Sequence, residues 1–235
     1  MGKQFSTAFG SRYGWRWTLL LLGGLAWLSI GCSPQSLSML IMPFTDTNIQ
    51  PEYPLFKPDK EITLVILSSF DRPPIHHDLL AADVELAGHL ANALRKRCAD
   101  NKHRIKIVQD AQVRGELLNR SSGAELRAVE IGKKFKADYV LDLTINSFSL
   151  YEPGFAPPFF RGRVDIATAL YKVDVKEGDH RVFYKDFRTE YPSTGPVEAG
   201  NVPAANFRNR FLPAVARDLS KVFISYPPEE RRNFE

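Results

Sequence analysis

The sequence predicts an α/β fold with a single mixed β-sheet of about five strands, packed by two or three long helices. Three observations predict it. An apolar, β-branched run at residues 61–70 is short enough to be a buried strand. A segment with helical period passes directly into a β-rich segment within residues 124–149. Residues 161–175 and 181–191 are two long strand-like segments, joined by a Lys-Glu-Gly-Asp turn.

The first half of the expected domain alternates strands and helices. After the strand at 61–70, residues 78–99 have apolar positions at helical spacing, and residues 103–108 alternate as a second strand. A short helix is expected at 113–118. The apolar face expected for the long helix consists of Leu80, Val84, Ala87, Ala91, Leu94 and Cys98.

The stretch at 124–149 organises the expected fold. Ala128, Ile131 and Phe135 recur at helical spacing, and lysines follow where cations suit the negative end of the helix dipole. The run from Tyr139 to Ile145 then alternates in the manner of a strand. We expect Leu141 and Leu143 in the core, and Asp142 on the opposite face, at an edge or partly exposed.

A final helix is expected at residues 204–224, beyond a Gly- and Pro-rich loop at 193–203. Its apolar side would consist of Phe207, Phe211, Val215, Leu219 and Val222. Pro213 lies inside this helix and is expected to kink it or to divide it into two pieces.

The first 31 residues have the anatomy of a signal peptide. Lys3, Arg12 and Arg16 precede an uncharged apolar run at 17–30. As a helix this run would span about 21 Å, short of the roughly 30 Å hydrocarbon core of a bilayer. Without these three cations, 28 of the 31 Lys and Arg residues remain against 27 Asp and Glu. The leader therefore carries most of the net positive charge that gives the chain its basic pI of about 9.0. For this reason, no nucleic-acid partner is expected.

Cys32 ends the apolar run. The sequence Leu-Ser-Ile-Gly-Cys at 28–32 resembles the bacterial lipobox, although Ser29 stands where that pattern prefers Leu. The resemblance implies a diacylated Cys32 at a mature N-terminus, and two acyl chains anchor a protein stably. Ser33 follows the cysteine. By resemblance to lipoprotein sorting in enterobacteria, a residue other than Asp at this position implies that the protein is anchored in the outer membrane, with the domain facing the periplasm. An ordinary secretory signal or an uncleaved anchor is the alternative.

These observations divide the chain into four parts. Residues 1–31 are the expected lipoprotein signal peptide, and 32–61 the lipidated N-terminus with a Pro-rich tether. Residues 62–226 form the α/β adaptor domain, and 227–235 are a charged tail. Cys98 is expected to pack as a small apolar residue late in a helix, since it has no disulfide partner once Cys32 is acylated.

Two short motifs are similar to a known group of bacterial envelope proteins. They are Ile-Gly-Lys at 131–133 followed by Ala-Asp-Tyr-Val-Leu at 137–141, and Leu-Tyr-Lys-Val-Asp at 170–174 before a glycine turn. They resemble the domain shared by the curli-secretion lipoprotein, the lipoprotein activators of penicillin-binding proteins, and the N-terminal domain of the Tol-system propeller protein. The resemblance implies a lipid-anchored, non-enzymatic accessory subunit of an envelope assembly, secretion or peptidoglycan-synthesis complex.

No nucleophile, phosphate-loop or metal motif occurs in the sequence. His76 and His77 are adjacent, so their side chains point apart, and no third ligand is spaced to join them. We therefore expect no metal, no cofactor and no small-molecule substrate. Two alternatives stay open: an enzyme with a site assembled from residues such as His76, His77, Asp142 and Asp165, or a periplasmic carrier of an apolar ligand between sheet and helices.

The loop at 151–160 is the predicted partner-binding surface. It holds four aromatic residues, Tyr151, Phe155, Phe159 and Phe160, together with three prolines in ten positions. Connections between strands normally run over the surface, and aromatic side chains there are typical binding anchors. The alternative is that these side chains fold back as a lid on the domain's own core.

Overall fold

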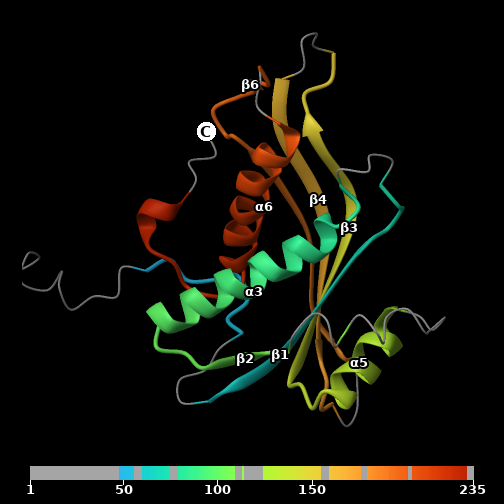
Figure 1. Cartoon of the computed structure of the whole chain (residues 1–235). Coiled ribbons are helices and arrows are strands. Elements are labelled where there is room, and N and C mark those ends of the chain that lie inside the picture. The colour runs from blue at the N-terminus through green and yellow to red at the C-terminus, as the bar shows by residue number, and fades with distance from the viewer. Residues whose placement is uncertain are drawn as a thin grey trace, which may run out of the picture. The chain divides into compact units, whose positions relative to one another are not determined.

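The computed structural model describes residues 48–55, 60–74, 79–108, 113, 124–154, 159–175, 179–200 and 203–231. Figure 1 shows one sheet with helices packed against it, which confirms the predicted α/β class. The strands are β1 (Ile62–Phe70), β2 (Ile105–Ile107), β3 (Tyr139–Tyr151), β4 (Phe159–Lys172), β5 (Arg181–Tyr191) and β6 (Val197–Glu198). The helices are α3 (Ala82–Asp100), α5 (Ala124–Lys134), α6 (Ala204–Ser220) and the short 3₁₀ helix η3 (Pro228–Glu230).

The sheet is mixed, with the strand order β2-β1-β3-β4-β5, and β6 pairs with the beginning of β4. β1 lies parallel to both β2 and β3, whereas β3, β4 and β5 are antiparallel. Parallel neighbours require a crossover, which α3 provides between β1 and β2. The antiparallel part is a meander of long strands, and β3 with β4 forms its central hairpin.

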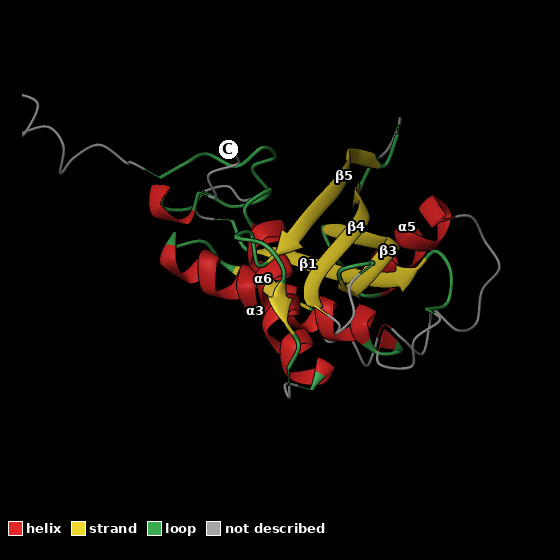
Figure 2. Cartoon of the chain, turned by 90° about the horizontal axis from the view of Figure 1, so that it is seen from above, coloured by secondary structure: helices red, strands yellow, loops and turns green. Residues whose placement is uncertain are grey.

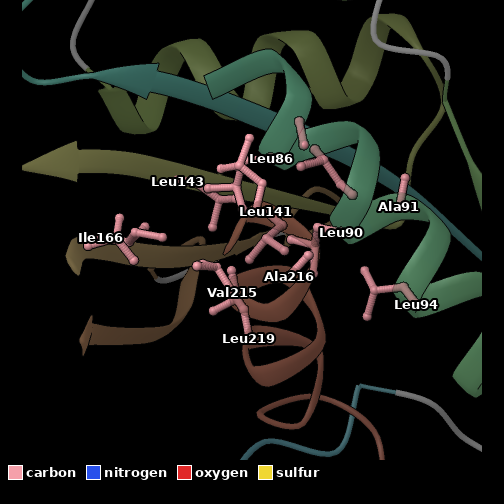
Figure 3. Close-up of a cluster of buried hydrophobic side chains, with 14 of the residues drawn as sticks. Leu86, Leu90, Ala91, Leu94, Leu141, Leu143, Ile166, Val215, Ala216 and Leu219 are labelled. Carbon is pink, nitrogen blue, oxygen red and sulfur yellow. The ribbon is translucent and has the colours of Figure 1, made fainter. Parts of the chain in front are cut away.

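One face of the sheet is covered by α3 and α6 (Figure 2). The labelled side chains from α3, α6, β3 and β4 point toward one another between these layers (Figure 3). Leu141 and Leu143 are both 0% exposed, so the predicted core strand is confirmed. Fully buried aliphatic side chains drive this packing, since each contributes roughly 1.5–3 kcal/mol when removed from water.

The opposite face is covered by α5, which packs on β3 and β4 at the end of the sheet where β3 begins. Ala128 and Ile131 of α5 meet Val140 and Val173 in a second, smaller core. Gly132 allows this close approach, because a Cβ there would lie 2.4 Å from a Val173 methyl carbon.

The structure differs from the sequence prediction at the start of α3. The helix begins at Ala82, and Leu80 precedes it with 65% of its surface exposed. Leu86, Leu90 and Leu94, spaced four apart, form the centre of the buried face instead. Cys98 is 1% exposed on the same face, as predicted, and burial raises the pKa of its thiol to about 12.

Two further points concern the second half of the domain. β3 continues to Tyr151 and β4 begins at Phe159, so the connection at 151–160 starts and ends in strand. Pro213 does not divide α6, which runs continuously from Ala204 to Ser220. The predicted apolar side of α6 is confirmed at Phe207, Phe211, Val215 and Leu219. The short helix expected at 113–118 lies outside the described residues except for the buried, helical Val113.

Residues 48–55, within the expected tether, pack against the chain just after α6. Ile49 forms an antiparallel bridge with Tyr226, and the backbone N–H of Tyr53 donates to the carbonyl of Val222 at 2.9 Å. In the expected tail, Glu230 forms an ion pair with Arg97, which is 6% exposed in α3. The described part of the chain contains no helix both long and apolar enough to cross a membrane.

Candidate functional site

The tip of the β3–β4 hairpin brings together the described aromatic residues of the predicted partner-binding surface. Tyr151 ends β3, and Phe159 and Phe160 begin β4. Tyr151 lies opposite Phe160 in the sheet, and the N–H of Glu152 donates to the carbonyl of Phe159 at 2.9 Å. β6 extends the sheet on the other side, with Val197 opposite Phe160.

A chain of aromatic rings joins this tip to the main core. The ring centroids of Tyr151 and Phe160 are 5.4 Å apart, and Phe160 stacks on Phe207 of α6 at 4.8 Å with an interplanar angle of 9°. Phe207 stacks in turn on Phe211, which also contacts Phe148. Phe160 is 4% exposed, whereas Tyr151 is 36% exposed. The tip therefore has a buried anchor and an exposed aromatic surface.

Two β-bulges determine which side chains point inward at the tip. The register of β3 against β4 shifts between Ile145 and Ser147, and again between Ser149 and Tyr151. Before the first shift, odd-numbered residues such as Ile145 face the main core, whereas Phe148 and Leu150 face it afterwards. Bulges redirect side chains in this way. Tyr151 lies opposite Phe160 on the same face of the sheet, at the end of β3, where it remains 36% exposed.

Gly162 allows α6 to approach the hairpin closely. A Cβ on Gly162 would lie 2.6 Å from the ring of Phe211, closer than real Cβ contacts occur. Only glycine leaves room for the aromatic ring on β4 at this position. The position of α6 therefore depends on Gly162, and so does the packing of Phe160 against this helix.

An ion-pair network lies beside the aromatic tip, on the sheet face opposite α6. Arg163 Nη2 donates to both carboxylate oxygens of Glu152, at 2.8 and 2.6 Å, and Arg161 lies 3.5 Å from the same carboxylate. Both arginines also pair with Glu190 of β5. The hydrogen bonds from Arg163, assisted by the positive charges, lower the pKa of Glu152. The network ties the end of β3 to β4 and β5.

The sequence analysis did not identify the four residues of this network, Glu152, Arg161, Arg163 and Glu190, as site residues. Arg161, Arg163 and Asp165 alternate with apolar residues along β4, which places all three on one face. That alternation was a usable signal for a charged sheet face. Their partner Glu152 could not be assigned from sequence, because the pairing depends on the hairpin register.

Of the remaining predicted site residues, Cys32 and Phe155 lie outside the described residues, as do His76 and His77. Neither the lipidation of Cys32 nor a role for Phe155 is therefore tested, and both stay predictions.

Asp142 is buried, contrary to the expectation of an edge or partly exposed position. It is 4% exposed beneath α5, between Leu67 of β1 and Ala169 of β4. Burial raises its pKa to about 6, and the charge of Arg127 on α5 partly offsets this shift. Among the described residues, its Oδ1 has no hydrogen-bond partner.

Asp165, the other carboxylate of the alternative enzyme site, is not brought next to Asp142. Asp142 lies opposite Ala169, four residues along β4 from Asp165, a separation of about 13 Å in a strand. Asp165 pairs instead with Arg188 at 2.8 Å. The described residues contain no cluster of three His, Cys, Asp or Glu side chains arranged to hold a metal ion.

A cavity of about 560 Å³ lies between β5, the end of α6 and the segment 48–55. Most of the residues that line it are polar or charged by type, and they include Glu52, Lys185, Asp186, Arg188, Asp218 and Lys221. A site for an apolar ligand would need a predominantly apolar lining. This cavity is therefore unlike the site that the carrier hypothesis requires.

No family model matches the sequence, and no curated protein matches it. Among solved structures, the PelC dodecamer from Paraburkholderia phytofirmans is similar with 12% identity and a TM-score of 0.43, over 74% of this chain and 94% of that one. Lipoprotein GNA1162 from Neisseria meningitidis has 12% identity and a TM-score of 0.37, over 68% and 96%. The LpoB C-terminal domain from Salmonella enterica has 14% identity and a TM-score of 0.35, over 65% and 90%. Of these three structures, the one from Neisseria meningitidis is that of a lipoprotein.

Proposed function

We propose that this chain is a lipid-anchored, non-enzymatic adaptor of the bacterial cell envelope. Cys32 would carry the lipid in the outer membrane, and the domain would face the periplasm. The tip of the β3–β4 hairpin would bind another envelope protein, with Tyr151 and Val197 as exposed contacts and with Phe159 and Phe155 as further contact residues.

One observation carries the binding part of the proposal: Tyr151 is exposed while the residue it contacts, Phe160, is anchored in the core. A preorganised aromatic side chain loses little entropy on binding, which favours its use as an anchor. The neighbouring network of Glu152, Arg161, Arg163 and Glu190 supplies a polar rim of both signs. An apolar centre with a polar rim is the usual composition of a protein-binding surface.

The anchor is tested by replacing each cysteine in turn. Cys32→Ala should abolish metabolic fatty-acid labelling and release the protein from the membrane fraction. Cys98→Ala is the matched control, because it removes the other cysteine and should leave labelling unchanged. If the Cys32→Ala protein keeps both its label and its membrane association, the apolar segment is not a lipoprotein signal.

The binding surface is tested with a double variant at the two exposed tip residues, Tyr151→Ser with Val197→Ser. Chemical crosslinking in intact cells should lose the adaptor–partner product, while the melting temperature stays within about 2 °C, since exposed substitutions change stability little. Tyr184→Ser, at a tyrosine that is 55% exposed on β5, is the control and should retain the product. Retention of the product by the double variant would place the partner elsewhere.

A further inference from the structure

The outer edge of β5 is the second surface with the features of a binding site. β5 pairs with β4 on one side and is the last strand of the sheet in the described part of the chain. It is 11 residues long, which is long for an exposed edge, and such edges readily pair with another strand. Figure 2 shows β5 at the outer border of the sheet.

The two faces of β5 have different characters. Phe183, Phe187 and Tyr191 pack toward the main core. Side chains alternate along a strand, so the even-numbered residues from Tyr184 to Glu190 lie on the other face. Tyr184, Asp186, Arg188 and Glu190 are all exposed. Alongside the core-facing residues lies the cavity of about 560 Å³, which is lined by residues 185–189 of β5.

The charge sequence of this edge is complementary to itself in one register. When two identical strands pair antiparallel about a two-fold axis, residues equally distant from the centre lie opposite each other on the same face. Three registers pair at least nine of the 11 residues of β5, with centres at Lys185, Asp186 or Phe187. The first would place Lys185 opposite itself, and the second would place Asp186 opposite itself.

Only the register centred on Phe187 avoids these like-charge contacts. It places Asp186 opposite Arg188 of the second copy, and Arg188 opposite Asp186, so that two ion pairs form by symmetry. Arg188 already donates from Nε to Asp165 at 2.8 Å, but its guanidinium has further N–H groups for a second carboxylate. Opposite charges across strands stabilise a pair, and like charges directly opposite destabilise it.

We propose that two copies of this chain associate through antiparallel pairing of their β5 strands, centred on Phe187. The two sheets then form one continuous sheet. This inference does not rest on the proposed adaptor function, since its central charged residues, Asp186 and Arg188, are not part of the proposed binding surface.

The test uses the full-length protein in detergent, with two affinity tags on separate copies. Wild-type copies should co-purify and sediment as a dimer. Asp186→Arg makes both central pairs Arg–Arg, and Arg188→Asp makes both Asp–Asp. Each variant alone should self-associate at least about tenfold more weakly than wild type. A mixture of the two variants should restore association, because each pair then again joins opposite charges.

The mixture also controls for folding, since it contains the same two chains that fail alone. The proposal is overturned if wild type sediments as a monomer, if the single variants self-associate like wild type, or if the mixture of folded variants does not associate.

A second measurement does not depend on charge. Phe187→Cys should form an intermolecular disulfide under mild oxidation, because the central residues of the two strands face each other. Lys185→Cys is the control: its two copies would be about 13 Å apart along the strands, beyond disulfide reach. Equal crosslinking of the two variants, or none with Phe187→Cys, would contradict the proposed register.

Discussion

The two ends of the β3–β4 hairpin are held in different ways. At the base, residues 139–145 and 166–172 are covered by α3 and α6 on one face and by α5 on the other. At the tip, residues 148–151 and 159–164 have α6 on one face and ion pairs on the other. The base resembles the interior of a two-sided sheet, whereas the tip has one buried face and one solvated face. The base is therefore enclosed by packing on both faces, whereas the tip keeps one face toward solvent.

The largest effect is expected at the buried anchor of the tip. Phe160→Ala should lower the free energy of unfolding by about 3–5 kcal/mol, since it removes a buried ring and leaves a cavity against Phe207. Urea unfolding followed by far-UV circular dichroism measures this, because all three tryptophans lie in the leader at positions 15, 17 and 27. A loss below about 1 kcal/mol would mean that Phe160 is not part of the core.

A similar substitution at the base provides the comparison. Leu141→Ala should cost about 2–5 kcal/mol, because Leu141 is fully buried between α3, α6 and the sheet. If Leu141→Ala lowered the free energy of unfolding much more than Phe160→Ala, the tip would not be an extension of the hydrophobic core. Comparable losses would support one continuous hydrophobic core along the hairpin.

Asp142 is a buried carboxylate within the otherwise apolar base, and its contribution to the stability of the protein depends on pH. Burial raises its pKa from 3.8 to about 6, so the folded state binds the proton more tightly than the unfolded state. The resulting stability is complete below pH 3.8 and is lost as pH rises through about 6, by roughly 3 kcal/mol. Asp142→Asn should therefore stabilise the protein at pH 8 and have little effect at pH 3.5. The pH dependence of urea unfolding checks this, and equal stability of the two proteins at both pH values would contradict it.

The base was predictable from sequence because both of its signals are local. Period two from Tyr139 to Ile145 and helical spacing at Ala128 and Ile131 are enough to place a buried strand against a helix. The face of α3 was predicted less well, because Leu80 fits the same helical spacing as the buried residues. Leu80 is not part of the buried face because α3 begins after it. The start of a helix is difficult to predict from sequence when no capping side chain marks it. Ala81 at the N-cap provides no such side chain.

The tip was predictable only as a loop rich in aromatic residues. The bulges around Asn146 and Leu150 exchange the inward and outward sides of β3, and a sequence pattern with period two does not reveal where a bulge occurs. The sequence also could not separate Phe160, which is buried against Phe207 of α6, from Tyr151, which lies opposite it and is exposed, because this difference depends on where α6 packs. The burial of Asp142 depends on α5 covering it, which is a tertiary effect that its own strand does not specify.

Site-specific photocrosslinking tests most directly whether the exposed side of the tip contacts another envelope protein. A photoreactive amino acid is placed at Tyr151 in the full-length protein, and in a second strain at Lys172, an exposed residue at the base of the same hairpin. After irradiation of intact cells, we expect a discrete crosslinked product from position 151 and none from position 172. Crosslinking from position 172 alone, or from neither position, would contradict the proposed binding surface.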